Sequence, residues 1–521
     1  MRLPILNPIQ KQKSVIGIFR GLNRTETIQD NEFREMQNLS SSQYPTVSPR
    51  RKRGDVMKKL TMPGGLYWKN GLAYVDGTEF WYKDKMVGIV SEGEKQLCGM
   101  GAYIVILPDK LIYNTADTAQ TEQKLEAIEV TWKQEAAATF APTYDGSVYT
   151  KISCTGIGKQ FEEGDAVTLS GCQNADFNKT AAIESRGDDF IVILGQITES
   201  LTQESGISVK RSMPDMDFIC EQDNRLWGCS TKNHEIYACK LGDPKNWNYF
   251  QGTAADSYAA TVGSDGDFTG CISHMGYVLF FKEDCMIKVY GNKPANIQLN
   301  TYAYRGVAKG CEKSLCIVNE TLYYAARDAV MAYDGGIPQP VSAALGTLEI
   351  SAAAAEQYQG KYYVSMQEKS GKWTLYAYDT QYQMWHAEDM TQFRSAEYGE
   401  GHLYYIDAEG NLREIDGGTQ EERVAWYADS ADQVEADIRK KKIARMQIMA
   451  EVKPGTLFEV FVSYDGSPMW ERVFTETALT KHSLQICIKP RRCSFFRYRI
   501  KGKGDFRLYA VEKLVQHGSG K

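Results

Sequence analysis

Two dense runs of basic side chains are the residues best suited to binding chemistry in this 521-residue sequence. The first consists of Arg50, Arg51, Lys52 and Arg53, and the second of Arg439, Lys440, Lys441 and Lys442. Four like charges in a row can bind phosphate groups or an acidic neighbouring protein. The simpler alternative is a solvated turn, or the exposed positions of a strand. Both interpretations stay open on the sequence alone.

Metal-ligating residue types occur, but their spacing does not suit a metal site. Cys229, His234 and Cys239 span ten residues of a predicted hairpin, whereas structural zinc uses Cys pairs two to four residues apart. No Asp-x-Asp-x-Asp-Gly calcium loop is present. We therefore expect no metal and no cofactor. Two further Cys pairs also fail the zinc spacing, namely Cys311 with Cys316 and Cys487 with Cys493.

Four aspartates, Asp76, Asp334, Asp379 and Asp407, recur at matching positions of a repeat. A glycoside hydrolase needs two carboxylates about 5 to 10 Å apart across the scissile bond. Because these aspartates recur with the repeat, they are better explained as turn formers. The sequence also contains no Gly-x-Ser-x-Gly elbow and no Gly-Lys-Ser/Thr phosphate loop. We therefore expect that the chain is not an enzyme, with a glycoside hydrolase as the less favoured alternative.

The repeat itself is a strand–turn–strand unit rich in Tyr and Trp. Its copies fall at residues 72, 103, 226, 278, 322, 362 and 403, with gaps of 31, 123, 52, 44, 40 and 41 residues. Five gaps match the roughly 30 to 50 residues of a four-stranded propeller blade, which cannot bury both faces alone. The sequence therefore predicts an all-β fold, a β-propeller of about seven blades. The blade-signature residues are Tyr74, Asp76, Trp227, Trp247, Tyr324, Tyr363, Tyr405 and Asp407.

Two regions depart from the repeat. Residues 116–213 contain alternating strands separated by Gly, Asp and Asn turns, which predicts a small β-barrel or sandwich inserted between blades. Beyond Gly418, five or six alternating strands predict a C-terminal β-sandwich at 424–515. The blades are then expected at 55–115 and 214–420.

The first 54 residues form a polar, irregular segment that does not fit a blade. Burying a large apolar side chain is worth about 1.5 to 3 kcal/mol, so we expect the segment to dock on the rest of the chain. Part of it is expected to supply a closing strand to the last blade, leaving the basic run at 50–53 at an edge for assembly. Its apolar residues include Ile16, Ile18, Phe19, Leu22 and Leu39.

Composition limits the other possibilities. The chain is 43% hydrophobic and 24% charged, as in ordinary globular proteins. A formal net charge of -6 argues against non-specific coating of nucleic acid. No apolar run approaches the roughly 18 residues that cross a membrane, so we expect synthesis in a cytoplasm and no membrane insertion. The twelve Cys, with no export signal beside them, are expected to be buried free thiols.

Short motifs resemble the opening of tail β-propeller proteins of bacteriophages, namely the tail nozzle and packaged-DNA stabilisation proteins of short-tailed phages. In the N-terminal segment these are Gly21-Leu22-Asn23, Asn31-Glu32, Met36-Gln37-Asn38-Leu39 and Pro49-Arg50-Arg51-Lys52-Arg53-Gly54. A middle blade adds Asn224-Arg225-Leu226-Trp227-Gly228 and the turn Asp243-Pro244-x-Asn246-Trp247. Two departures are Phe19-Arg20 in place of the family's first Gly, and no Pro between Arg53 and Gly54.

The resemblance implies a structural protein of the virion tail, made in the bacterial host cytoplasm. It implies a ring of about six copies that surrounds or closes the DNA exit channel. Its partners would be further copies of itself, the portal, adaptor or other tail proteins, and viral DNA that passes without sequence-specific binding. An acidic or neutral wall suits that role, because strong phosphate binding would slow ejection. The alternative is a tail module that binds a receptor or carbohydrate, with Tyr and Trp stacking on sugars.

Overall fold

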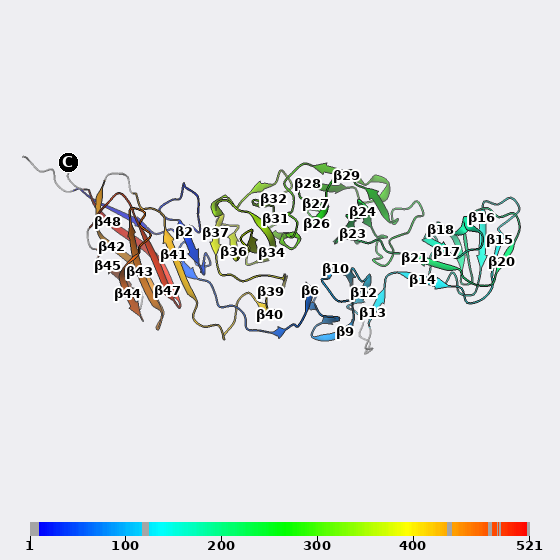
Figure 1. The fold of residues 1–521 in the computed structure, drawn as a ribbon, viewed down its shortest axis with the longest axis horizontal. Helices are drawn as coiled ribbons and strands as arrows, with labels where there is room; N and C mark the ends of the chain where they lie inside the picture. The colour runs from blue at the N-terminus through cyan, green and yellow to red at the C-terminus, as the bar shows by residue number, and fades with distance from the viewer. Residues whose placement is uncertain are drawn as a thin grey trace, which may run out of the picture. The chain divides into compact units, whose positions relative to one another are not determined.

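The computed structural model describes residues 10–116, 124–434, 440–477, 482–486, 488 and 491–517, and this part of the chain is built from antiparallel strands (Figure 1). The chain divides into two compact units, Leu60–Val307 and Met1–Lys59 with Ala308–Lys521. The described residues form seven four-stranded sheets of the blade type, four in the first unit and three in the second. The predicted fold class, an all-β protein with about seven propeller blades, is confirmed.

The four blades of unit Leu60–Val307 are meanders of sequential strands. Each repeat found in the sequence supplies the second strand of a blade and the turn after it. The strands are β6 (Pro63–Trp68), β7 (Leu72–Asp76), β8 (Glu79–Tyr82) and β9 (Lys85–Ile89); β10 (Gln96–Met100), β11 (Tyr103–Leu107), β12 (Leu111–Asn114) and β13 (Leu125–Ala127); β22 (Phe218–Gln222), β23 (Arg225–Ser230), β24 (Glu235–Ala238) and β25 (Tyr258–Thr261); β26 (Phe268–His274), β27 (Tyr277–Lys282), β28 (Cys285–Tyr290) and β29 (Gln298–Tyr302).

Tight turns and apolar faces explain why these segments form blades. In five of the seven blades the first two strands are joined by two residues that both have positive φ, which matches the twist of a two-residue hairpin. Apolar side chains of successive sheets then form shared cores, as where Val75 and Phe80 pack with Ile104 and Ile106. The five pairs are Asp223-Asn224, Met275-Gly276, Asn319-Glu320, Gln359-Gly360 and Glu400-Gly401.

An eight-stranded domain lies between β13 and β22, inside the range expected for an insertion. Its strand order is β14-β21-β17-β18-β19-β16-β15-β20, so its first and last strands pair and return the chain to the blades. Its own core includes Phe140, Phe161 and Phe177. The strands are β14 (Val130–Lys133), β15 (Ala138–Pro142), β16 (Tyr149–Ser153), β17 (Ala166–Ser170), β18 (Thr180–Gly187), β19 (Phe190–Leu194), β20 (Leu201–Gln203) and β21 (Ser208–Arg211).

The second unit contains three blades, and the last of them is closed by a strand that lies just beyond the N-terminal segment in the sequence. The last blade has the order β38-β39-β40-β5, and β5 (Lys58–Lys59) pairs Lys59 with Asn411 and Lys58 with Leu412. The other strands are β30 (Cys316–Val318), β31 (Thr321–Ala325), β32 (Val330–Tyr333) and β33 (Gln339–Pro340); β34 (Ile350–Tyr358), β35 (Lys361–Glu368), β36 (Trp373–Asp379) and β37 (Met384–Ala387); β38 (Ser395–Gly399), β39 (His402–Ile406) and β40 (Asn411–Glu414).

The C-terminal sandwich has two five-stranded sheets, and each contains one strand from the N-terminal segment. In the first sheet β1 (Gln10–Ile16) pairs with β48 (Phe506–His517), and in the second β2 (Phe33–Gln37) pairs with β41 (Ala425–Ser430) (Figure 1). The other strands are β42 (Lys441–Val452), β45 (His482–Ile486) and β46 (Arg492–Cys493) in the first sheet, and β43 (Leu457–Tyr464), β44 (Glu471–Thr477) and β47 (Phe496–Lys503) in the second.

These pairings correct the expected role of the N-terminal segment. The closing strand comes from residues 58–59, just beyond the segment, and residues 10–37 complete the sandwich instead. The apolar residues Phe19, Leu22 and Leu39 are buried, whereas Ile18 is exposed. The physical reason is that two sandwich sheets offered open edges, whose unpaired backbone groups the segment satisfies.

Candidate functional site

Residues 38–54 of the N-terminal segment, here called the strap, join the sandwich to the last two blades of the same unit. The strap contains the short pair β3 (Leu39–Ser40) and β4 (Ser48–Pro49). At its start, the backbone N–H of Asn38 donates to Ala387, and the Asn38 side-chain amide donates to the carbonyl of Ala425. At its end, Gly54 N–H donates to Glu414 in the last blade. The strap is therefore held from both sides along its length.

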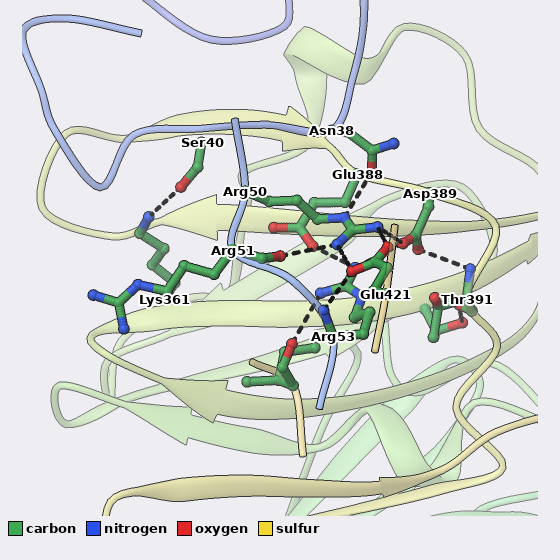
Figure 2. Close-up of polar contacts among 12 residues, drawn as sticks. Asn38, Ser40, Arg50, Arg51, Arg53, Lys361, Glu388, Asp389, Thr391 and Glu421 are labelled. Atoms are coloured by element: carbon green, nitrogen blue, oxygen red, sulfur yellow. Dashed lines mark hydrogen bonds and ion pairs between the residues drawn. The ribbon is translucent and has the colours of Figure 1, made fainter. Parts of the chain in front are cut away.

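A charge cluster holds the strap at Arg50 and Arg53 (Figure 2). The two terminal nitrogens of Arg50 donate to both carboxylate oxygens of Glu421, at 2.7 and 3.0 Å. Arg53 Nη2 lies 2.6 Å from Glu388 Oε2 and 3.1 Å from Asp389 Oδ2, and Asp389 also lies 3.0 Å from Arg50. The two arginine side chains are only 6% and 9% exposed. Buried charges of this kind persist because each is paired and hydrogen-bonded.

The cluster changes the acidity of its members. Burial alone would raise the pKa of Asp389, but the charges of Arg53 and Arg50 and hydrogen bonds from Thr391 outweigh it and lower the pKa to about 2. Burial alone would also raise the pKa of Glu421, but its hydrogen bonds with Arg50 outweigh this effect and lower the pKa. Burial would lower the pKa of Arg53, yet Asp389 and Glu388 raise it. These shifts in pKa favour the ionised forms of Asp389, Glu421 and Arg53 at neutral pH.

This geometry corrects the expectation that the first basic run is available as a unit for phosphate or assembly contacts. Arg50 and Arg53 are used inside the molecule. Figure 2 shows the Arg51 side chain directed away from the cluster, and this side chain is 68% exposed and pairs with Asp416 at 3.2 Å. Lys52 is partly exposed. The alternation follows from the strap's course between two surfaces of the protein, which buries residues 50 and 53 and exposes residue 51.

The second basic run is divided in a similar way. Arg439 lies outside the described residues, and Lys440 and Lys442 are exposed. Lys441 is 1% exposed, and its ammonium donates to the carbonyl of Val434. Lys441 begins β42, so alternate side chains of the strand point into and out of the sandwich. The expected contact surface is therefore reduced to Lys440 and Lys442.

The blade-signature aromatics are core residues in the structure. Each side chain is less than 10% exposed, although each carries a polar hydroxyl or indole N–H group. Burial in a blade interior raises the pKa of Tyr405 and of Tyr363, as expected for phenols that stay neutral. These side chains therefore stabilise the blades and offer no sugar-stacking surface. They are Tyr74, Trp227, Trp247, Tyr324, Tyr363 and Tyr405.

The recurring aspartates all accept hydrogen bonds from backbone N–H groups at turns. Asp76 accepts from Thr61 and Met62, and Asp407 accepts from Glu409 and Asn411. Asp334 accepts from Gly336, and Asp379 from Gln381 and Tyr382. Such bonds fix a turn without leaving the carboxylate free for chemistry.

A buried network that the sequence did not indicate anchors the inserted domain to its neighbouring blade. Asp165 is fully buried, and its carboxylate accepts from Arg211 at 2.7 Å and from the Asn246 amide at 2.6 Å. The motif Asp243-Pro244-x-Asn246-Trp247 is therefore a docking turn, and Trp247 Nε1 donates back to Pro244. The sequence singled out Asn246 alone, as part of a motif. Asp165 and Arg211 could not be linked to it because they lie more than thirty residues away in the sequence.

Two open clefts flank the strap. The first, of about 500 Å³, is lined by strap residues 48–52, the loop at Gly417 and Gly418, and sandwich residues that include Arg507. The second, of about 600 Å³, lies beside Arg53 and the last blade, and its walls include Tyr405 and Asp407. Pockets of this size accommodate small ligands. Over the described ranges, no three His, Cys, Asp or Glu residues are arranged to hold a metal ion, and the described cysteines are free thiols.

No protein-family model matches the sequence, and no curated protein is similar to it. Among solved structures, the chain is similar to an exo-β-1,3-galactanase from Phanerochaete chrysosporium, with 10% identity, TM-score 0.24, and 57% of this chain and 95% of that chain covered. It is also similar to Hsv2 from Kluyveromyces lactis, with 11% identity, TM-score 0.27 and coverages of 56% and 73%. A phage phi92 endosialidase aligns over 94% of this chain and 75% of its own, with 10% identity and TM-score 0.18.

These comparisons correct one expectation. The prediction that the chain is not an enzyme is withdrawn, because two of the similar structures are carbohydrate-cleaving enzymes. At this level of similarity the likeness concerns the fold and assigns no activity to this chain. The described residues contain no helix long and apolar enough to cross a membrane.

Proposed function

We propose that this chain is a structural protein of a bacteriophage tail. The observation that carries the proposal is the buried cluster of Arg50 and Arg53 with Glu388, Asp389 and Glu421, which fastens the N-terminal strap between two β domains. A structural part of an assembly needs domains held in a fixed arrangement, and the buried ion pairs of this joint support such a role. Removing one partner of a buried ion pair typically costs about 3–5 kcal/mol, so the joint tolerates little change.

The motifs behind the resemblance to phage tail propeller proteins support the same role. Gly21 lies against β37, where an added Cβ would come within 2.0 Å of the Trp385 carbonyl oxygen. Arg50 and Arg53 form the charge cluster, and Asn246 holds the inserted domain. Residues of all three motifs thus make contacts that join separate parts of the chain. Motifs of this kind are expected in a protein selected for rigidity.

The finer proposal is a place in the tail. The protein would form a ring of about six copies around the DNA exit channel, with portal, adaptor or other tail proteins as neighbours. Its net charge of -6 supports passage of DNA without tight binding.

Complementation tests the structural role. A phage that lacks this gene is supplied with the wild-type protein, with Arg53→Met, or with the exposed control Arg51→Met. We expect infectious particles with the wild type and with Arg51→Met, and a strong loss with Arg53→Met. Normal titres of complete particles in the absence of any copy of the protein would refute the proposal.

A second candidate function is carbohydrate binding by a tail module. The open cleft of about 500 Å³ beside the strap favours it, because the cleft combines cationic side chains with neutral polar groups. The two candidates are compatible, since one chain can serve both as a rigid part of a tail and as a binding module.

A further inference from the structure

The cleft of about 500 Å³ is formed where three separate segments meet. The strap supplies residues 48–52, the loop after the last blade supplies Gly417 and Gly418, and the sandwich supplies residues of β42 and β48 with the turns beside them. All three segments belong to the same compact unit. The cleft therefore exists only when the strap is docked.

Most charges in the cleft are already paired. Arg50 is held by Glu421 and Asp389, Arg51 pairs with Asp416, and Lys453 pairs with Asp505 at 2.9 Å. In the described part of the chain, the Lys52 ammonium and the two terminal nitrogens of Arg507 make no hydrogen bond and no ion pair. Two cationic groups thus remain on the cleft walls of a protein whose overall charge is negative.

Arg507 is also fixed in orientation. Its Nε donates to Thr46 Oγ1 at 3.0 Å, and its guanidinium carbon lies 5.2 Å from the centre of the Tyr509 ring. These contacts restrain the side chain while its terminal nitrogens stay available. A restrained guanidinium loses little conformational entropy when it binds a planar anion by donating two parallel hydrogen bonds. Lys52, on the strap, supplies a second positive charge.

The remaining walls are polar and uncharged. The uncharged polar residues Gln43 and Ser48 line the cleft, together with Gly417 and Gly418, which can contribute only backbone groups. Groups of this kind suit the hydroxyls of a sugar, and the volume suits a ligand of one or two rings. Glu451 also lines the cleft and would disfavour a ligand with several negative charges close together.

We infer that this cleft binds an acidic saccharide unit. Arg507 would take the anionic group bidentately, Lys52 would add a second contact to it, and Gln43 with the Gly417–Gly418 backbone would hydrogen-bond the hydroxyls. The anion is a carboxylate, as in a hexuronate, or a phosphate ester on a sugar. The inference rests on the second candidate function and not on the structural role in the tail.

The test is titration calorimetry on the full chain at low ionic strength with four probes, namely glucuronate, glucose 6-phosphate, glucose and inorganic phosphate. We expect one acidic sugar to bind at least about tenfold more tightly than glucose and than inorganic phosphate, since both the anion and the hydroxyls are recognised. The tighter of the two acidic sugars identifies the anion. Affinity for inorganic phosphate or for glucose equal to that for the tighter acidic sugar would overturn the inference, as would no heat of binding from either acidic sugar at millimolar concentration.

Variants place the binding in the cleft. Arg507→Gln is expected to weaken the preferred acidic sugar at least about tenfold, and Arg507→Lys to lose less because the charge remains. Lys369→Gln, which removes an exposed cation outside the cleft, is the matched control and should bind as the wild type. Thermal melting of each variant verifies folding, and Lys52→Gln provides a second, strap-based variant. Undiminished binding by folded Arg507→Gln and Lys52→Gln would overturn the inference. Because none of these measurements uses virions, failure of the saccharide inference would leave the structural proposal unaffected.

Discussion

At the scale of single residues, partners distant in the sequence determine what each charged side chain does. Arg50 to Arg53 form one basic run, yet Arg53 is buried against Glu388 and Asp389 while Arg51 faces solvent. The sequence could identify the run, but not this division, because the acidic partners lie more than 330 residues away. The four recurring aspartates were easier to interpret, since their turn contacts are mostly local.

Arg53 and Arg51 make a matched pair for the first prediction. Arg53→Met should lower the unfolding free energy by about 3–5 kcal/mol, because Glu388 and Asp389 would stay buried without their cation. Arg51→Met should change it by less than about 0.5 kcal/mol, as expected for an exposed pair. Urea unfolding followed by tryptophan fluorescence measures both. Equal losses in the two variants would contradict the role assigned to the cluster.

A second residue-scale prediction concerns Glu356 on β34. Burial raises its pKa to about 7, and the Cys316 thiol donates to its carboxylate at 3.6 Å. Since the folded pKa lies above the unfolded value, the stability that Glu356 contributes is present below about pH 4.5 and is lost as the pH rises through about 7. Glu356→Gln should therefore gain about 3 kcal/mol relative to the wild type between pH 4.5 and pH 8.

Urea unfolding of both proteins across that pH range measures the Glu356 effect. The exposed Glu349→Gln serves as the control for loss of one carboxylate. A difference between Glu356→Gln and the wild type that stays constant over the range would show that Glu356 is not held neutral by burial.

At the scale of elements, the repeated hairpins were predictable and the exchanged strands were not. Each hairpin has its own apolar alternation, and most have their own two-residue turn, such as Gln359-Gly360, so the pattern is local. By contrast, β1 pairs with β48 at the opposite end of the sequence, and β5 has only two residues. Neither a partner so remote nor a strand so short leaves a periodic signal. The sequence therefore predicted the blades but assigned the N-terminal segment to the wrong edge.

Close packing of the N-terminal segment on β37 gives an element-scale prediction. An added Cβ at Gly21 would meet the Trp385 carbonyl oxygen at 2.0 Å, and backbone cannot move away as a flexible side chain can. Gly21→Ala should therefore destabilise the protein by at least about 2 kcal/mol. At Gly17, the nearest atom would lie 4.0 Å from the new Cβ, so Gly17→Ala is the control and should be within about 0.5 kcal/mol of the wild type. Thermal unfolding compares the two; if Gly21→Ala is as stable as Gly17→Ala, the segment does not dock as described.

At the scale of the whole molecule, the N-terminal segment and the C-terminal domain form one folding unit. Deleting residues 1–54 would remove β1, β2 and the strap together, which exposes the edges of two sheets. It would also leave the carboxylates of Glu388, Asp389 and Glu421 without their arginine partners. We expect the truncated protein to aggregate or to melt well below the full chain, because open edges pair with other chains. Light scattering and calorimetry compare the two proteins, and a monomeric 1–54 deletion of full stability would contradict the integrated fold.

The most direct test of the central claim, a structural part of a phage tail, is to determine whether the protein is in the particle. Particles released from cells that carry this gene are purified through two density gradients and analysed by quantitative mass spectrometry, with electron cryomicroscopy of the tail. The account predicts this chain at a fixed, low copy number per particle and density for its blades and sandwich within the tail. Complete, infectious particles that lack the chain, with the protein found only in the soluble fraction of the lysate, would contradict it.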